Sequence, residues 1–157
     1  MEQQEINLWR MVDVGGYSAM GTFFAFALES IKTNIEDDNN DNTNNIQEQM
    51  DKINSSYEKI SKRFQKINLN LLDKRFPVDT LRKLKGQVFP EMGKKYKELD
   101  TLLKHYISGA VYLKIRILNK IKECKELVKQ MGDLGIEFSK NERYWEYRKT
   151  NPERIYL

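Results

Sequence analysis

A heptad pattern of apolar residues between residues 46 and 71 constrains the fold of this chain more than any other feature. Apolar side chains recur at alternating spacings of four and three residues, at Ile46, Met50, Ile53, Tyr57, Ile60, Phe64, Ile67 and Leu71. This spacing gathers them on one stripe of an α-helix, which must pack against another helix. Isoleucine at every d position disfavours a parallel dimer, so we expect the stripe to pack inside an antiparallel helical hairpin or bundle.

A second, longer helix is predicted between residues 91 and 131, where apolar residues again recur mostly at spacings of three and four. Pro90 suits its first turn and Gly132 suits its end. Gly109, in the middle of this helix, suggests a close crossing by another helix. Residues 74–90 contain two prolines and a glycine among apolar residues at helical spacing, which predicts a short connecting helix.

The rest of the chain also favours helices. Only three residues are proline, and the charged fraction of 32% is rich in helix-forming Lys and Glu. Residues 133–138 are expected to form a turn with a short extended piece, and Ser139 with Glu142 forms a capping-box pattern ahead of a short helix. The predicted fold is all-α: a long antiparallel helical hairpin or coiled coil, with a separate N-terminal apolar helix and a short C-terminal helix.

Charge is divided unevenly along the chain. Residues 1–45 contain two cationic and eight anionic side chains, a net charge of −6, whereas the remainder contains 25 cations and 15 anions, a net charge of +10. Residues 33–45 are nearly all Asn, Asp and Thr, which favour turns, so we interpret them as a solvated linker. The predicted organisation is an apolar helix (1–32), an acidic Asn-rich linker (33–45), a helical hairpin (46–132) and a C-terminal aromatic and basic docking segment (133–157).

Residues 14–28, VGGYSAMGTFFAFAL, contain no charged side chain. As a helix they would extend over about 22 Å, less than the ~30 Å hydrocarbon core of a bilayer. Apolar side chains surround this helix, so it must be enclosed by a bilayer, by another subunit or by the chain's own core, and all three alternatives stay open. We expect it to act as an independent anchor. The predicted membrane or partner contacts are Trp9, Tyr17, Gly21, Phe23, Phe24, Phe26 and Leu28.

Aromatic and cationic side chains are mixed near the C-terminal end, where Tyr144, Trp145 and Tyr147 lie close to Arg143 and Arg148. This combination is typical of protein-interface hot spots and of residues that stack on nucleic-acid bases. The alternative is that the aromatic rings fold back on the hairpin. We interpret the three aromatic residues as candidate partner contacts.

A cationic region lies where the two predicted hairpin helices are connected. Residues 62–97 contain eleven Lys or Arg side chains and three acidic ones, a net charge of +8. Such a region could meet the phosphates of nucleic acid or of anionic lipid, or could simply be the solvated face of helices. The candidate anionic-surface contacts are Lys62, Arg63, Lys66, Lys74, Arg75, Arg82, Lys83, Lys85, Lys94 and Lys95.

Patterns typical of catalysis are scarce. His105 is the only histidine and Cys124 the only cysteine, and on one straight helix they would be about 28 Å apart. The chain contains no glycine motif of the phosphate-binding kinds. We therefore expect no catalytic residue, metal, cofactor or small-molecule substrate. A single cysteine cannot form an internal disulfide, and no signal-peptide pattern opens the chain, which favours an intracellular or organellar protein over a secreted one.

These patterns together predict a non-enzymatic helical accessory or scaffold subunit of a larger protein assembly, anchored through its N-terminal helix. The expected partners are other protein subunits, with membrane association through residues 14–28 as an option. The competing hypothesis is a nucleic-acid-binding helical module that uses the basic region.

Overall fold

The computed structural model describes residues 17–37, 43–73 and 75–150, and every regular element in these ranges is helical. The four long helices are α2 (Tyr17–Glu36), α3 (Thr43–Gln65), α5 (Phe89–Ile107) and α6 (Lys114–Ser139). The short elements are the 3-10 turns η2 (Leu69–Leu71) and η4 (Val111–Leu113), helix α4 (Val78–Lys83), the π-helical turn η3 (Leu84–Val88) and helix α7 (Glu142–Thr150). The prediction of an all-α protein is confirmed for the described residues.

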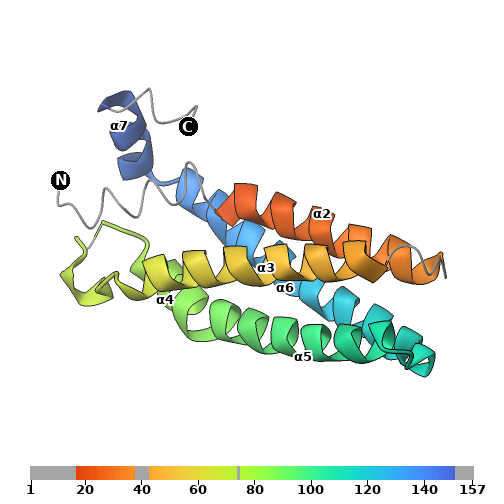
Figure 1. Cartoon of the computed structure of the whole chain (residues 1–157). Helices are drawn as coiled ribbons and strands as arrows, with labels where there is room; N and C mark the ends of the chain where they lie inside the picture. The colour runs from red at the N-terminus through yellow and green to blue at the C-terminus, as the bar shows by residue number, and fades with distance from the viewer. Residues whose placement is uncertain (1–16, 38–42, 74, 151–157) are drawn as a thin grey trace.

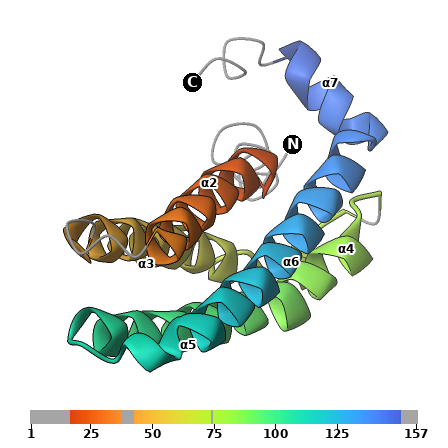
Figure 2. The same ribbon diagram turned by 90° about the vertical axis from the view of Figure 1, so that its right-hand side faces the viewer.

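The four long helices form an antiparallel bundle, in which each long helix runs opposite to the one before it in the chain (Figure 1). Helix α2 packs against α3 and α6, and α5 packs against α3 and α6, so each long helix has two neighbours. Lys125 of α6 forms an ion pair with Glu29 of α2, and Lys120 of α6 lies 2.5 Å from Glu98 of α5. The view along the bundle shows α2 and α5 on opposite sides (Figure 2). The arrangement is an up-down four-helix bundle.

The heptad stripe of α3 faces the core of this bundle as far as residue 67. Its buried members are Ile46, Met50, Ile53, Ile60, Phe64 and Ile67, with Tyr57 partly buried beside them. Leu71 is exposed, because α3 ends at Gln65 and the chain then turns through η2. The stripe therefore predicts the buried face of α3 and places the end of this helix nearly two turns too late.

Aromatic rings from three helices meet inside the bundle. The ring of Tyr96 on α5 lies 5.6 Å from Phe24 of α2 and 5.7 Å from Tyr57 of α3, measured between centroids. Phe64 of α3 and Phe89 of α5 are 5.3 Å apart in an edge-on arrangement, which aromatic pairs favour. The bulky residues of the α3 stripe thus find room between helices, as an antiparallel bundle allows.

The single long helix predicted between residues 91 and 131 is wrong, because the chain reverses at residues 108–113. Helix α5 ends at Ile107, and α6 begins at Lys114 and runs back beside α5. Gly109 has a φ of +119°, a conformation that glycine adopts readily because it lacks a β-carbon. No atom lies within 4 Å of the position its β-carbon would occupy, so Gly109 serves the turn and no helix crosses there.

The predicted turn and extended piece at residues 133–138 are also wrong, since α6 continues through Gly132 to Ser139. Leu134 and Phe138, one turn apart on α6, are both buried, and this burial favours continuing the helix. The capping residue of α7 is Asn141 rather than Ser139: the Asn141 side chain accepts a hydrogen bond of 2.9 Å from the Arg143 backbone N–H.

The predicted separate N-terminal helix is wrong for the described residues, because α2 is part of the bundle. Its buried residues recur at helical spacing, past the end of the uncharged stretch: Phe24, Ala27, Leu28, Ile31 and Ile35. This stripe faces α3 and α6. The uncharged stretch alone did not reveal this stripe, because two of the stripe's five residues lie among polar and charged neighbours beyond position 28.

The predicted linker is shorter than residues 33–45. Helix α2 extends to Glu36 and α3 begins at Thr43, so only a few residues separate the two helices. Among the residues that the structure describes, no helix combines the length and the apolar character needed to cross a bilayer.

Candidate functional site

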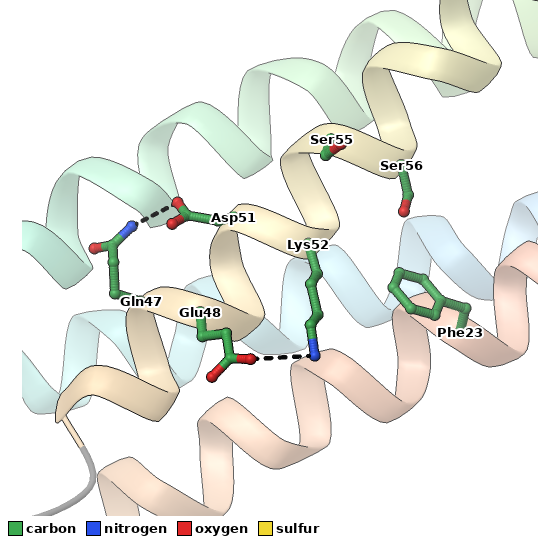
Figure 3. Close-up of a pocket in the computed structure, with 7 residues that line it drawn as sticks. All are labelled: Phe23, Gln47, Glu48, Asp51, Lys52, Ser55 and Ser56. Carbon is green, nitrogen blue, oxygen red and sulfur yellow. Dashed lines mark hydrogen bonds and ion pairs between the residues drawn. The ribbon is translucent and has the colours of Figure 1, made fainter.

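A shallow groove lies between α2 and α3 and has a volume of about 680 Å³. Figure 3 shows Phe23 of α2 on one side and polar side chains of α3 on the other. The polar wall consists of Gln47, Glu48, Asp51, Lys52, Ser55 and Ser56. The groove thus combines one aromatic wall with one hydrogen-bonding wall.

The aromatic wall follows from the helical spacing of α2. Because Phe24, Ala27 and Leu28 point into the core, Phe23 and Phe26 are turned toward solvent. Phe23 is 38% exposed and Phe26 is 74% exposed. The Phe23 ring lies edge-on to Phe24, 5.8 Å between centroids, which ties the groove residue to the core.

The polar wall is internally paired. Lys52 lies 3.5 Å from Glu48, and the Gln47 amide donates a hydrogen bond of 2.8 Å to Asp51 (Figure 3). Both pairs join residues one turn apart on α3, where such pairs stabilise a helix modestly. The lining contains no histidine or cysteine, and its charged side chains are Glu48, Asp51 and Lys52.

The structure divides the predicted contacts of the N-terminal helix into two groups. Phe23 and Phe26 are accessible to a partner. Phe24, Leu28 and Gly21 are buried by the chain itself, with Gly21 against Val128 of α6, so the prediction that they touch a partner is wrong for the folded bundle. Tyr17 is the first residue of α2, and Trp9 lies outside the described residues.

The C-terminal aromatic residues divide in the same way. Tyr144 and Tyr147 are buried, whereas Trp145 is about half exposed and stacks edge-on against Tyr144, 5.3 Å between centroids. Only Trp145 of the three therefore presents a large surface to a partner.

The start of α7 is held against the segment before α4. Arg143 lies 3.2 Å from Asp73 and places its guanidinium over the Phe76 ring, 5.8 Å from the centroid. Hydrogen bonds from the Arg75 backbone and side chain, aided by the charge of Arg143, lower the pKa of Asp73. The Asn141 amide also donates to the Arg75 carbonyl at 3.3 Å. The sequence pattern did not indicate this contact, which joins residues about 70 positions apart.

The predicted cationic region gathers at the end of the bundle where α3 ends and α5 begins (Figure 1). Several members have acidic neighbours: Lys62 pairs with Glu58, Arg75 with Asp73, Arg82 with Asp79, and Lys95 with Glu91 and Glu123. Lys85 contacts the Ile67 carbonyl at 3.5 Å. Exposed cations that make no ion pair with another described residue are Arg63, Lys66, Lys83 and Lys94. Lys74 lies outside the described residues.

Cys124 is buried in the core, and burial raises the pKa of its thiol to about 12, which disfavours the reactive thiolate. His105 is exposed on α5, whereas Cys124 lies on α6. The separation predicted along one straight helix therefore does not apply, because the two residues lie on different helices. Within the described ranges, no three His, Cys, Asp or Glu side chains are grouped so that they could hold a metal ion.

Sequence reasoning missed an exposed apolar surface at the turn between α5 and α6, formed by Val111, Tyr112 and Ile115. The signal available was the Ser-Gly-Ala run at residues 108–110, which marks a turn as readily as a close helix crossing. No family model, curated protein or solved structure matches this chain.

Proposed function

We propose that this chain is a non-enzymatic helical accessory or scaffold subunit of a larger protein assembly, and that it binds a neighbouring subunit through the α2–α3 groove. The observation that carries the proposal is the pair of outward-facing phenylalanines, Phe23 and Phe26, on a helix whose other face is buried. Exposed aromatic residues beside a groove are typical of protein-binding surfaces.

The occupant that fits this groove is an amphipathic helix of another subunit. An apolar ridge on such a helix would cover Phe23 and Phe26, and its polar flank would meet the hydroxyl and amide groups of α3. Trp145 offers a second apolar contact on a separate part of the chain. Because Glu48 and Lys52 are already paired, the polar wall requires no strongly charged partner.

The test places a photo-crosslinking phenylalanine analogue at position 26 of the full chain in its native source. A subunit bound in the groove should be crosslinked there, and Phe26→Ser should remove the same subunit from a pull-down while the helical content stays unchanged. Leu71 is a matched control, since it is also exposed but lies in η2. Crosslinking that is equal at positions 26 and 71 would contradict the proposal.

The competing proposal is that the cationic end of the bundle binds nucleic acid. It rests on Arg63, Lys66, Lys83 and Lys94, which are exposed and make no ion pair with another described residue. Binding of a fluorescent duplex should then weaken steeply with salt, and Arg63→Gln with Lys66→Gln should reduce the salt dependence by about two phosphate contacts. We favour the scaffold proposal because no nucleic-acid recognition motif accompanies the charge.

A further inference from the structure

The turn between α5 and α6 presents three apolar side chains to solvent. Val111 is 67% exposed, Tyr112 is 81% exposed and Ile115 is 72% exposed. Their orientation follows from the buried residues between and after them, since Leu113 and Ile117 face the core. An exposed apolar group of this kind, projecting at the end of a bundle, marks a contact surface.

The turn, together with the adjoining ends of α5 and α6, is cationic and contains no acidic residue. Residues 101–122 contain Lys104, Lys114, Arg116, Lys120 and Lys122, one histidine and no Asp or Glu. Lys120 forms ion pairs with Glu98 and Glu123, at 2.5 and 3.0 Å. Arg116 and Lys122 are exposed and make no ion pair with another described residue, while Lys104 pairs with Asp100 at 3.0 Å and stays largely exposed. The partner of this surface should therefore carry negative charge.

The acidic end of α2 lies at the same end of the bundle but on the other side. Glu36 is the last residue of α2 and Asp37 follows it, whereas the α5–α6 turn lies on the side away from α2 (Figures 1 and 2). A flat anionic surface that approaches from the α5 side would meet the cations and apolar side chains of the turn before the carboxylates of α2.

We infer that the α5–α6 tip, defined as Val111, Tyr112 and Ile115 with Lys104, Arg116 and Lys122, docks on the surface of an anionic lipid bilayer. Apolar side chains beside cations suit the boundary between headgroups and acyl chains, where the apolar groups enter and the cations stay with the phosphates. Tyrosine is also enriched at this depth of a membrane. The phosphates of nucleic acid would explain the cations but not the exposed valine and isoleucine.

The inference is independent of the proposed protein-binding groove, because the tip and the groove share no residue. The test sediments the full chain with vesicles of phosphatidylcholine alone and of phosphatidylcholine mixed with phosphatidylserine. We expect binding to the mixed vesicles that weakens with salt. Tyr112→Ser with Ile115→Ser should lower the partition coefficient roughly tenfold or more, from the loss of inserted apolar surface. Arg116→Gln and Lys122→Gln should each lower it roughly fivefold.

Matched controls are Leu71→Ser and Ile136→Ser, which remove exposed apolar side chains elsewhere and should leave vesicle binding unchanged. Equal binding to both kinds of vesicle, or binding unaffected by the tip substitutions, overturns the inference. So does a Tyr112-dependent association of two copies, or of a protein partner, without vesicle binding. The Arg116 and Lys122 variants keep the test decisive if the double serine variant is poorly folded. Crosslinking at position 26 should be the same in all tip variants.

Discussion

The hydroxyl of Tyr57 on α3 occupies the space beside Gly93 of α5 that a β-carbon would need. It donates a hydrogen bond of 2.5 Å to the Phe89 carbonyl, and a β-carbon on Gly93 would lie only 2.6 Å from the hydroxyl oxygen. The Tyr57 ring is held further by Tyr96, 5.7 Å between centroids. The Tyr57 side chain on α3 and the absence of a side chain at Gly93 on α5 thus fix how these two helices align.

Gly93→Ala should therefore destabilise the bundle. Because the Tyr57 ring is held at both its edge and its hydroxyl, it cannot move aside cheaply, and we expect a loss of about 1–3 kcal/mol in the free energy of unfolding. Gly132→Ala in α6 is the control, since nothing lies within 4 Å of its added carbon; it should raise stability by about 0.5–1 kcal/mol. Urea unfolding measures both, and equal effects would contradict the packing.

Gly109→Ala distinguishes the turn from a continuous helix. In a continuous helix this change would stabilise the protein by about 1 kcal/mol. At a φ of +119° it should instead destabilise by about 1–3 kcal/mol, through backbone strain alone, because no atom crowds the site. A thermal melt of the variant distinguishes the two cases: a lower melting temperature supports the turn, and a higher one supports a continuous helix.

Phe24→Lys and Phe26→Lys test whether α2 belongs to the bundle. Phe24 is fully buried, so a charge there should cost more than about 3 kcal/mol, whereas Phe26 faces solvent and its replacement should change stability by less than about 0.5 kcal/mol. Circular dichroism melts of the two variants provide the comparison. If neither variant changed the melting temperature, α2 would not be needed for the fold. That result would support the prediction of a separate N-terminal anchor.

Ile60→Asp and Asn68→Asp test the stripe on α3. Ile60 is buried between helices, and an unpaired carboxylate there should destabilise the bundle by about 3 kcal/mol or more. Asn68 is exposed, and its side chain accepts a hydrogen bond from the Asn70 N–H that a carboxylate can also accept. The Asn68 variant should melt within a few degrees of the parent protein, and coincident melts of both variants would place the stripe on the surface.

Stability should fall as the pH rises above about 9. Burial raises the pKa of Cys124 from 9.0 to about 12 and raises the pKa of Tyr96 well above 10.0. Above the unfolded pKa of each group, the unfolded chain binds fewer protons than the folded one, so unfolding becomes more favourable with pH. The stability that the protonated Cys124 thiol contributes is fully present below pH 9.0. It is lost as the pH rises to about 12.

Urea unfolding at a series of pH values should show this loss, and Cys124→Ala should flatten its first part. Replacing the thiol leaves a small cavity, but that cost does not depend on pH. Parallel pH profiles for the variant and the parent protein would show that the Cys124 thiol does not contribute.

Local patterns were sufficient to predict the buried face of α3 and the helical class. The run from Ile46 to Ile67 repeats at the period of a helix, and every member but Tyr57 is buried. Phe23, Phe26 and Trp145 were also singled out from the sequence, and all three keep exposed surface. In these cases residue type and spacing already determine which side of a helix avoids water.

Tertiary structure alone decided what each apolar face meets. The stripe of α2 packs against α3 and α6. The ion pair of Lys125 with Glu29 also joins α6 to α2, across more than 90 residues of the chain. Periodicity continues across the turn at Gly109, because the residues on both sides face the same core, so the pattern could not reveal that the chain reverses there. The spacing of apolar residues in the sequence determines which face of a single helix is apolar. The pairing of faces depends on where turns return the chain, and that is a property of the packed bundle.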